Sequence, residues 1–278
     1  MTTTLRIKRH IAVPMLAIGA MALLAMPAAG ASTKPPLPPT KVGVATSVPL
    51  TSTIKSASFL NQAGKPVTLE SLKGKTVFLV PLLTLCTDTC PFTSGNLLQL
   101  YAKLGAANDK NVVIVTIAVD PYRDTVKRIA AYAKIIDAKF QMWTENATTS
   151  KPVPPPNLSG KNSVGTGDTN ATLTAFEKFF GWTVQVVKED TPASVDWMAP
   201  YEKLTYDINH SDGFWIISPS QVVRFESGNA PQFHGTLATA LAKFIDANGQ
   251  YTYKHPTPGG WTPAQAVAAL SYVDGKIL

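Results

Sequence analysis

Cysteine is scarce in this chain, which has only Cys86 and Cys90 among 278 residues. Two cysteines cannot build the framework of several disulfides that stabilises small secreted domains. The chain does not need such a framework, because 45% of its residues are hydrophobic and can form an ordinary core. We therefore expect the two cysteines to be functional rather than structural.

Histidine is scarce as well, with four residues in the whole chain. A structural zinc site normally takes four protein ligands. The sequence has no second cysteine pair and few histidines to complete such a site. This shortage disfavours zinc.

A large excess of one charge is also absent. Charged residues make up 15% of the chain, and the formal net charge is +7. Removal of residues 1–31 would take away Arg6, Lys8 and Arg9, so the net charge would fall from +7 to +4. So mild an excess does not predict nucleic-acid binding.

Only one apolar run has the length of an export or membrane segment. Residues 11–25 carry no charge and follow Arg6, Lys8, Arg9 and His10, a pattern typical of an export signal. The small residues 29–31 predict cleavage after Ala31, and an uncleaved membrane anchor is the alternative. The expected location is the periplasm or cell envelope, with or without a membrane tether.

The rest of the chain predicts one large domain. Residues 32–41 are rich in proline and read as a linker. The domain is expected over residues 42–247, with a polar, proline-containing surface insertion at 146–172. Residues 248–278 form a tail in which Thr262 and Pro263 predict the start of a short helix.

The order of the predicted elements indicates a fold class. Apolar runs predict strands at 76–83 and 112–119 and a hairpin of 214–217 with 222–225. Helical spacing appears at 93–104, at 125–136 with Asp124 as the expected N-cap, and at 236–245. This order favours an α/β, thioredoxin-like fold with a central mixed β-sheet flanked by helices.

Cys86 and Cys90 lie where the first strand turns into the first helix. The dipole and free N–H groups of a helix N-terminus favour thiolate over thiol, so the pair is expected to be redox-active, metal-binding or both. Two sulfurs at i and i+4 can close a disulfide or converge on one soft metal ion. Copper(I) is the natural candidate for such a site.

A third ligand would have to come from the histidines that follow the export segment. His210 is favoured, because it precedes the strand 214–217 in a polar loop that a thioredoxin-like fold places near the cysteines. His234, just before the predicted last helix, and His255, in the tail, are less well placed.

At these positions the chain resembles the Sco/SenC family of copper-handling, thioredoxin-fold proteins. The Cys-x-x-x-Cys-Pro loop is present as Cys86 to Pro91, and residues 119–125 resemble the family's Val-Asp-Pro-x-Arg-Asp-Thr segment. His210 stands where the family has an Asp-His before an aromatic strand. Thr87 replaces the family's usual proline, and Asn209 replaces the aspartate that often precedes the histidine.

The resemblance implies a metallochaperone for cytochrome c oxidase assembly. Cys86, Cys90 and His210 would bind one copper ion, as Cu(I) or Cu(II), and pass it to a copper-accepting oxidase subunit or to another cuproprotein. An oxidised Cys86–Cys90 disulfide would bind none, since metal binding needs the thiolates. Asp88 would either orient the loop and screen the thiolates or cap the following helix.

The alternative is a thiol–disulfide oxidoreductase that uses Cys86 and Cys90 as its redox pair in the same compartment. Such chemistry does not need His210, and ordinary reductases of this fold space their cysteines by two residues. Enzymatic activity is therefore left open at this stage. A peroxidase with a Thr-x-x-Cys motif at Thr87 and Cys90 is disfavoured, because Leu83 stands where a proline is expected.

Overall fold

The computed structural model describes residues 36–145, 165–166, 171–188, 195–256 and 258–278. Residues Pro35–Leu278 form one compact unit. The expected export segment at 1–31, residues 32–35 of the expected linker and residues 146–164 and 167–170 of the expected insertion lie outside the described part. Within that part, no helix is both long enough and apolar enough to cross a membrane.

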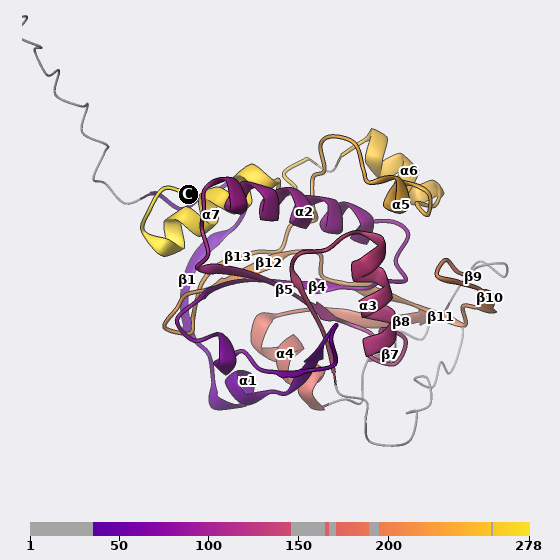
Figure 1. Ribbon diagram of the computed structural model, residues 1–278, viewed down its shortest axis with the longest axis horizontal. Helices are drawn as coiled ribbons and strands as arrows, with labels where there is room; N and C mark the ends of the chain where they lie inside the picture. The colour runs from indigo at the N-terminus through magenta and orange to yellow at the C-terminus, as the bar shows by residue number, and fades with distance from the viewer. Residues whose placement is uncertain (1–35, 146–164, 167–170, 189–194, 257) are drawn as a thin grey trace, which may run out of the picture. The chain divides into compact units, whose positions relative to one another are not determined.

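A mixed β-sheet forms the centre of this unit. Among the described residues, eight strands pair in the order β1-β13-β12-β4-β5-β6-β2-β3 (Figure 1). Their bounds are β1 Val44–Pro49, β2 Phe59–Asn61, β3 Pro66–Val67, β4 Thr76–Leu82, β5 Val112–Ala118, β6 Gln141–Glu145, β12 Phe214–Ile217 and β13 Val222–Ser227. The strand pairs β4–β5 and β5–β6 are parallel, whereas β12 is antiparallel to both β4 and β13.

This topology confirms the predicted thioredoxin-like α/β fold. The parallel pair β4 and β5 is joined by a crossover helix, and the antiparallel hairpin β12–β13 adds on the other side of β4. The predicted strands at 76–83, 112–119, 214–217 and 222–225 correspond to β4, β5, β12 and β13. Every residue of β4 and of β12 is buried, which explains their continuous apolar sequence.

Two smaller sheets, which the sequence did not predict, lie beside the main one. The first has the order β11-β8-β7 and the second pairs β10 with β9. Their bounds are β7 Gly165–Thr166, β8 Val184–Lys188, β9 Val195–Asp196, β10 Ala199–Lys203 and β11 Tyr206–His210. Through β11, the first of these sheets carries His210.

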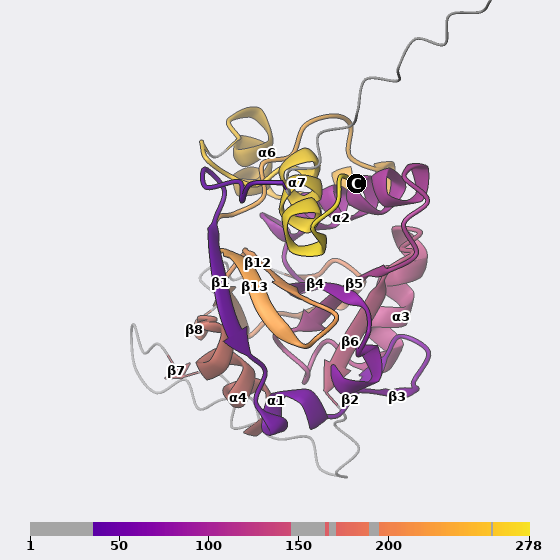
Figure 2. The same cartoon turned by 90° about the vertical axis from the view of Figure 1, so that its left-hand side faces the viewer.

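Helices cover both faces of the main sheet. Their bounds are α1 Ser52–Ser56, α2 Cys90–Ala106, α3 Val126–Ile135, α4 Ala171–Phe180, α5 Thr239–Ala242, α6 Ala247–Lys254 and α7 Pro263–Asp274, with a short 3-10 turn at Glu70–Leu72. Figure 2 shows α2 and α7 on one side of the sheet and α1 and α4 on the other. Successive side chains of β4 point to opposite faces of the sheet, so the hydrophobic core has two parts. Phe78 and Val80 pack with α2 and α7, whereas Val77 and Leu79 pack with α4.

Of three further local predictions, two are wrong and one is confirmed. The N-cap of α3 is Thr125 rather than Asp124, because the Thr125 hydroxyl accepts the Arg128 N–H while Asp124 is buried. The continuous helix expected at 236–245 is wrong, since only the short α5 forms there before the chain turns into α6. The helix expected from Thr262 and Pro263 is confirmed as α7, which begins with a capping box from Thr262 and Gln265.

Candidate metal and thiol site

The cysteine loop joins the end of β4 to the start of α2. Cys86 lies in the loop, and Cys90 is the first residue of α2. The Cys90 backbone N–H donates to the Cys86 sulfur over 3.4 Å. One of the helix N-terminal donors that have no partner within the helix is therefore satisfied by a sulfur atom. Both cysteines are free thiols in this structure.

His210 is distant from the cysteine loop in the sequence but contacts it in the fold. Its Nε2 lies 3.3 Å from the Cys90 Sγ, although the two residues are 120 positions apart. The prediction that His210 lies in a polar loop is wrong, because it is the last residue of β11 and pairs with Val184 of β8. This pairing explains its position, since a strand end fixes a side chain more firmly than a loop does.

The second nitrogen of the His210 ring determines what Nε2 can do. Nδ1 lies 2.8 Å from the carbonyl oxygen of Ser211, which can only accept a hydrogen bond. In the neutral ring, Nδ1 therefore carries the hydrogen, and Nε2 presents a lone pair to Cys90. A backbone carbonyl on the non-ligating nitrogen is a common way of orienting a metal-binding histidine.

Burial of Cys90 opposes its ionisation. The side chain is enclosed, with 1% of the residue exposed. Burial raises the pKa of the Cys90 thiol well above its ordinary value, and the Cys86 thiol and the Asp212 carboxylate raise it further. The expectation that the helix N-terminus favours thiolate is therefore wrong for Cys90 in the metal-free protein. The Cys90 S–H is instead suited to donate to the lone pair of His210.

A pocket of about 390 Å³ opens onto this group of residues, and its lining includes Cys86 and His210. Within the part of the chain that the structure describes, no three or more His, Cys, Asp and Glu side chains are already grouped to hold a metal ion. Cys90 and His210 thus form a preformed pair. Cys86, half-buried at the pocket wall, would have to adjust to complete a site with three ligands.

Four carboxylates are among the residues that line the pocket: Asp88, Asp207, Asp212 and Asp246. Burial raises the pKa of Asp88, and the nearby charge of Asp246 adds to the increase. Asp88 does not cap α2, because its carboxylate accepts the Thr252 hydroxyl over 3.3 Å and the N-cap of α2 is Thr89. Of the two roles considered for Asp88, a helix cap is therefore wrong.

The other two histidines of the described chain form contacts elsewhere. Both are exposed, and the Gln99 amide donates to the backbone carbonyl of His234 over 3.1 Å. The ring of His255 stacks on Tyr251 at 4.3 Å between centroids. Neither histidine lines the pocket that Cys86 and His210 share.

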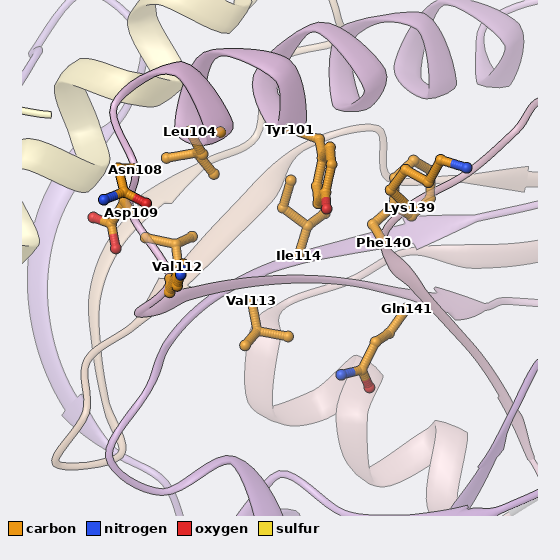
Figure 3. Close-up of a pocket in the computed structure, with 12 residues that line it drawn as sticks. Tyr101, Leu104, Asn108, Asp109, Val112, Val113, Ile114, Lys139, Phe140 and Gln141 are labelled. Atoms are coloured by element: carbon orange, nitrogen blue, oxygen red, sulfur yellow. The ribbon is translucent and has the colours of Figure 1, made fainter.

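A second pocket, also of about 390 Å³, lies between the far end of α2 and β5 (Figure 3). Tyr101 and Leu104 point into it from α2, and Ile114 lies across from them (Figure 3). Its lining has no cysteine and no histidine, so it lacks the ligands that a soft metal requires.

A buried polar network supports the cysteine loop, and the sequence did not reveal it. Thr84, two residues before Cys86, donates both its backbone N–H and its hydroxyl to the Asp124 carboxylate. Its hydroxyl accepts the Arg128 Nε over 2.6 Å, and its carbonyl accepts the Trp197 indole N–H over 2.7 Å. Arg128 then binds the Asp196 carboxylate through both terminal nitrogens. Asp124 of the segment 119–125 thus helps to fix the base of the loop.

This network makes the stability of the protein depend on pH. Burial raises the pKa of Asp124 to about 7, aided by the charge of Asp120 and opposed by Thr84 and Arg128. The folded state therefore holds a proton on Asp124 that the unfolded chain has lost by about pH 5. The stabilisation from this proton is present below about pH 4 and disappears as the pH rises through 7.

We expect the Asp124→Asn variant to lose this pH dependence. Its free energy of unfolding should change less between pH 4 and pH 8 than that of the unmodified protein, by up to about 4 kcal/mol for three pKa units. Urea denaturation at a series of pH values measures the difference. Two parallel stability curves would contradict the assignment, whatever the overall destabilisation caused by the substitution.

Part of the chain is similar in sequence to a known protein family. Residues 49–151 match the SCO1/SenC family model. The chain is 35% identical over 95 residues to the SCO1 protein homolog of Bacillus subtilis (strain 168). The aligned region covers 34% of this chain and 49% of that protein. It is also 30% identical over 99 residues to a Stutzerimonas stutzeri protein named "Putative copper-binding protein". This aligned region covers 36% of this chain and 48% of that protein.

The chain spans about half the length of these curated relatives. Among solved structures, Arabidopsis thaliana ScoI with copper bound is 22% identical, with a TM-score of 0.44 over 71% of this chain and 96% of that one. The match to the SCO1/SenC family model therefore covers residues 49–151, which include Cys86 and Cys90, and agrees with the resemblance found in the sequence.

Proposed function

We propose that this protein is a copper-binding metallochaperone that holds one copper ion through Cys86, Cys90 and His210. The observation that carries the proposal is the 3.3 Å contact between the Cys90 sulfur and Nε2 of His210. At bond lengths of about 2.3 Å to sulfur and 2.0 Å to nitrogen, two ligands of one metal lie roughly 3.6 Å apart. A small movement of the pair would therefore admit an ion.

The donor set matches copper better than other metals. Thiolates are soft ligands that favour Cu(I), and imidazole allows the site to tolerate Cu(II) as well. His210 lies outside the residues that match the family model. The structure therefore supports its role independently of the sequence match.

The proposed client is a copper-accepting subunit of cytochrome c oxidase or another cuproprotein, as the family resemblance implies. Cys86 faces the pocket whereas Cys90 is buried behind it. An acceptor could therefore replace the bond to Cys86 first and the bond to the buried Cys90 afterwards. The proposed compartment is the periplasm or cell envelope, on the basis of the apolar run 11–25, which would also supply any membrane association.

We expect the reduced protein to bind one equivalent of Cu(I) in competition with a chelator. His210→Ala should weaken the affinity at least tenfold, equivalent to about 1.4 kcal/mol. The Cys86→Ser, Cys90→Ser double variant should lose tight binding, because both soft ligands are gone. His234→Ala provides the matched control, since this exposed histidine lies outside the pocket, and it should bind like the unmodified protein. Equal affinities for the His210 and His234 variants would rule out the proposed site.

A thiol–disulfide oxidoreductase is the second candidate, and the unequal exposure of the two thiols favours it. The Cys86 thiolate would attack a client disulfide, forming a mixed disulfide and releasing one client thiolate, which takes up a proton. Cys90 would then attack Cys86, releasing the second client thiol and forming the Cys86–Cys90 disulfide. Burial raises the pKa of Cys90, so it would lose its proton only as it attacks, and the departing client sulfur would take up that proton.

The mixed disulfide should accumulate in one single-cysteine variant only. With a disulfide-containing peptide as client, Cys90→Ser should trap the covalent adduct on Cys86, because the resolving thiol is absent. Cys86→Ser should trap little, since Cys90 is buried. Mass spectrometry of the intact protein distinguishes the two variants. Equal trapping by both would contradict these assigned roles.

A further inference from the structure

Beyond α5, the chain turns back onto the cysteine loop and binds Thr87, the residue that follows Cys86. The backbone N–H of Asp246 donates to the Thr87 carbonyl over 3.1 Å, and the Thr87 hydroxyl donates to the Asp246 carboxylate over 2.8 Å. The other carboxylate oxygen accepts the Gly249 N–H over 2.8 Å, which makes Asp246 the N-cap of α6. One side chain thus begins α6 and binds the residue that follows Cys86.

Further contacts extend from α6 to residues that follow Thr87. The Thr252 hydroxyl donates to the Asp88 carboxylate over 3.3 Å. The Tyr253 ring stacks on Phe92, in the first turn of α2, with 5.8 Å between the centroids and 7° between the planes. Figure 1 shows α6 beside one end of α2, together with α5. The helix therefore contacts both the loop and the helix that carry the two cysteines.

Gly249 allows α6 to approach the loop closely. A Cβ atom added at this position would lie 2.7 Å from the Thr87 carbonyl oxygen and 2.1 Å from the Ile245 Cγ2. The Thr87 oxygen belongs to the backbone, so it cannot move aside without moving the cysteine loop. The helix backbone thus lies directly against the loop, with no side chain between them.

Packing of the hydrophobic core does not explain this arrangement. All residues of α6 are described, and Gly249 is the one that is buried. Residues 247, 248, 250, 251, 253 and 254 are exposed. A helix whose buried residue faces the cysteine loop contributes little to the core, and most of its polar contacts are with that loop.

We infer that α6 is a clamp that positions the cysteine loop, with Asp246, Gly249 and Thr252 as its positioning residues. By holding Thr87 and Asp88, the α6 clamp restricts the loop backbone next to Cys86, so that mainly the Cys86 side chain is left to adjust when a metal binds. It thereby reduces the ordering that metal binding would otherwise require. Its effect on copper rests on the proposed function, whereas its effect on the exposure of the thiols does not.

The Gly249→Ala variant tests the clamp, because the added methyl group must separate α6 from the loop. We expect iodoacetamide to alkylate Cys86 several-fold faster than in the unmodified protein, and the Cu(I) affinity to fall by 10–100-fold, the range found for outer-shell partners of metal ligands. The urea midpoint should change little, since α6 adds little to the core. Gln250→Ala, on the exposed side of the same helix, is the matched control and should leave both quantities unchanged.

A second pair of variants avoids any steric disturbance. Thr252→Val removes the hydroxyl that binds Asp88. It should speed the alkylation of Cys86 and weaken Cu(I) binding, each by a smaller factor than Gly249→Ala. Thr252→Ser retains the hydroxyl and should restore them. A merely structural role of α6 would not distinguish valine from serine in the alkylation rate.

The two readouts separate the clamp from the proposed copper site. If Gly249→Ala and Thr252→Val alkylate and bind Cu(I) like the unmodified protein, the clamp is overturned while the copper site stands. If the unmodified protein fails to bind Cu(I) but alkylation of Cys86 still accelerates in both variants, the clamp stands and the copper function fails.

Discussion

The contact between the Cys90 sulfur and the His210 imidazole unites the site, and the sheet topology makes it possible. Because β12 runs antiparallel to β4 and pairs Trp215 with Leu79, the start of β12 lies beside the end of β4. His210 ends β11 four residues before Phe214, so it arrives where the cysteine loop begins. Gly213 permits this course, since a Cβ there would lie 1.8 Å from the Ser227 carbonyl oxygen.

The cysteine loop is held from two sides. The buried network of Thr84, Asp124 and Arg128 fixes its entry from β4. On the other side, the α6 clamp binds Thr87 and Asp88. Between them, Cys86 remains accessible from the pocket while Cys90 is enclosed. This division would suit the proposed copper transfer, because a partner could exchange with Cys86 while Cys90 keeps its position.

Sequence reasoning predicted the parts of the fold that depend on strong local patterns. The strands β4, β5 and β12 are mostly apolar runs, β13 alternates buried and half-buried residues, and α2 and α3 have clear helical spacing. The helix expected at 236–245 failed because tertiary contacts overrode its periodicity. Leu237 and Leu241 are buried as a helix would require, but Phe244 packs on Trp197 and the chain then turns so that Asp246 binds Thr87. The pairing of β11 with β8 was also missed, because short strands leave little pattern.

The two cysteines and His210 could be selected from the sequence, whereas Thr84, Asp196 and the α6 clamp depend on contacts between distant segments.

X-ray absorption at the copper edge of the Cu(I)-loaded protein tests the assignment of His210 most directly. The proposed site predicts two sulfur scatterers and one nitrogen scatterer, with the outer-shell features of an imidazole ring. In His210→Ala the sulfur contribution should remain and the imidazole features should disappear. Spectra that contain sulfur alone in the unmodified protein, or that do not change in the variant, would contradict a site shared by Cys86, Cys90 and His210.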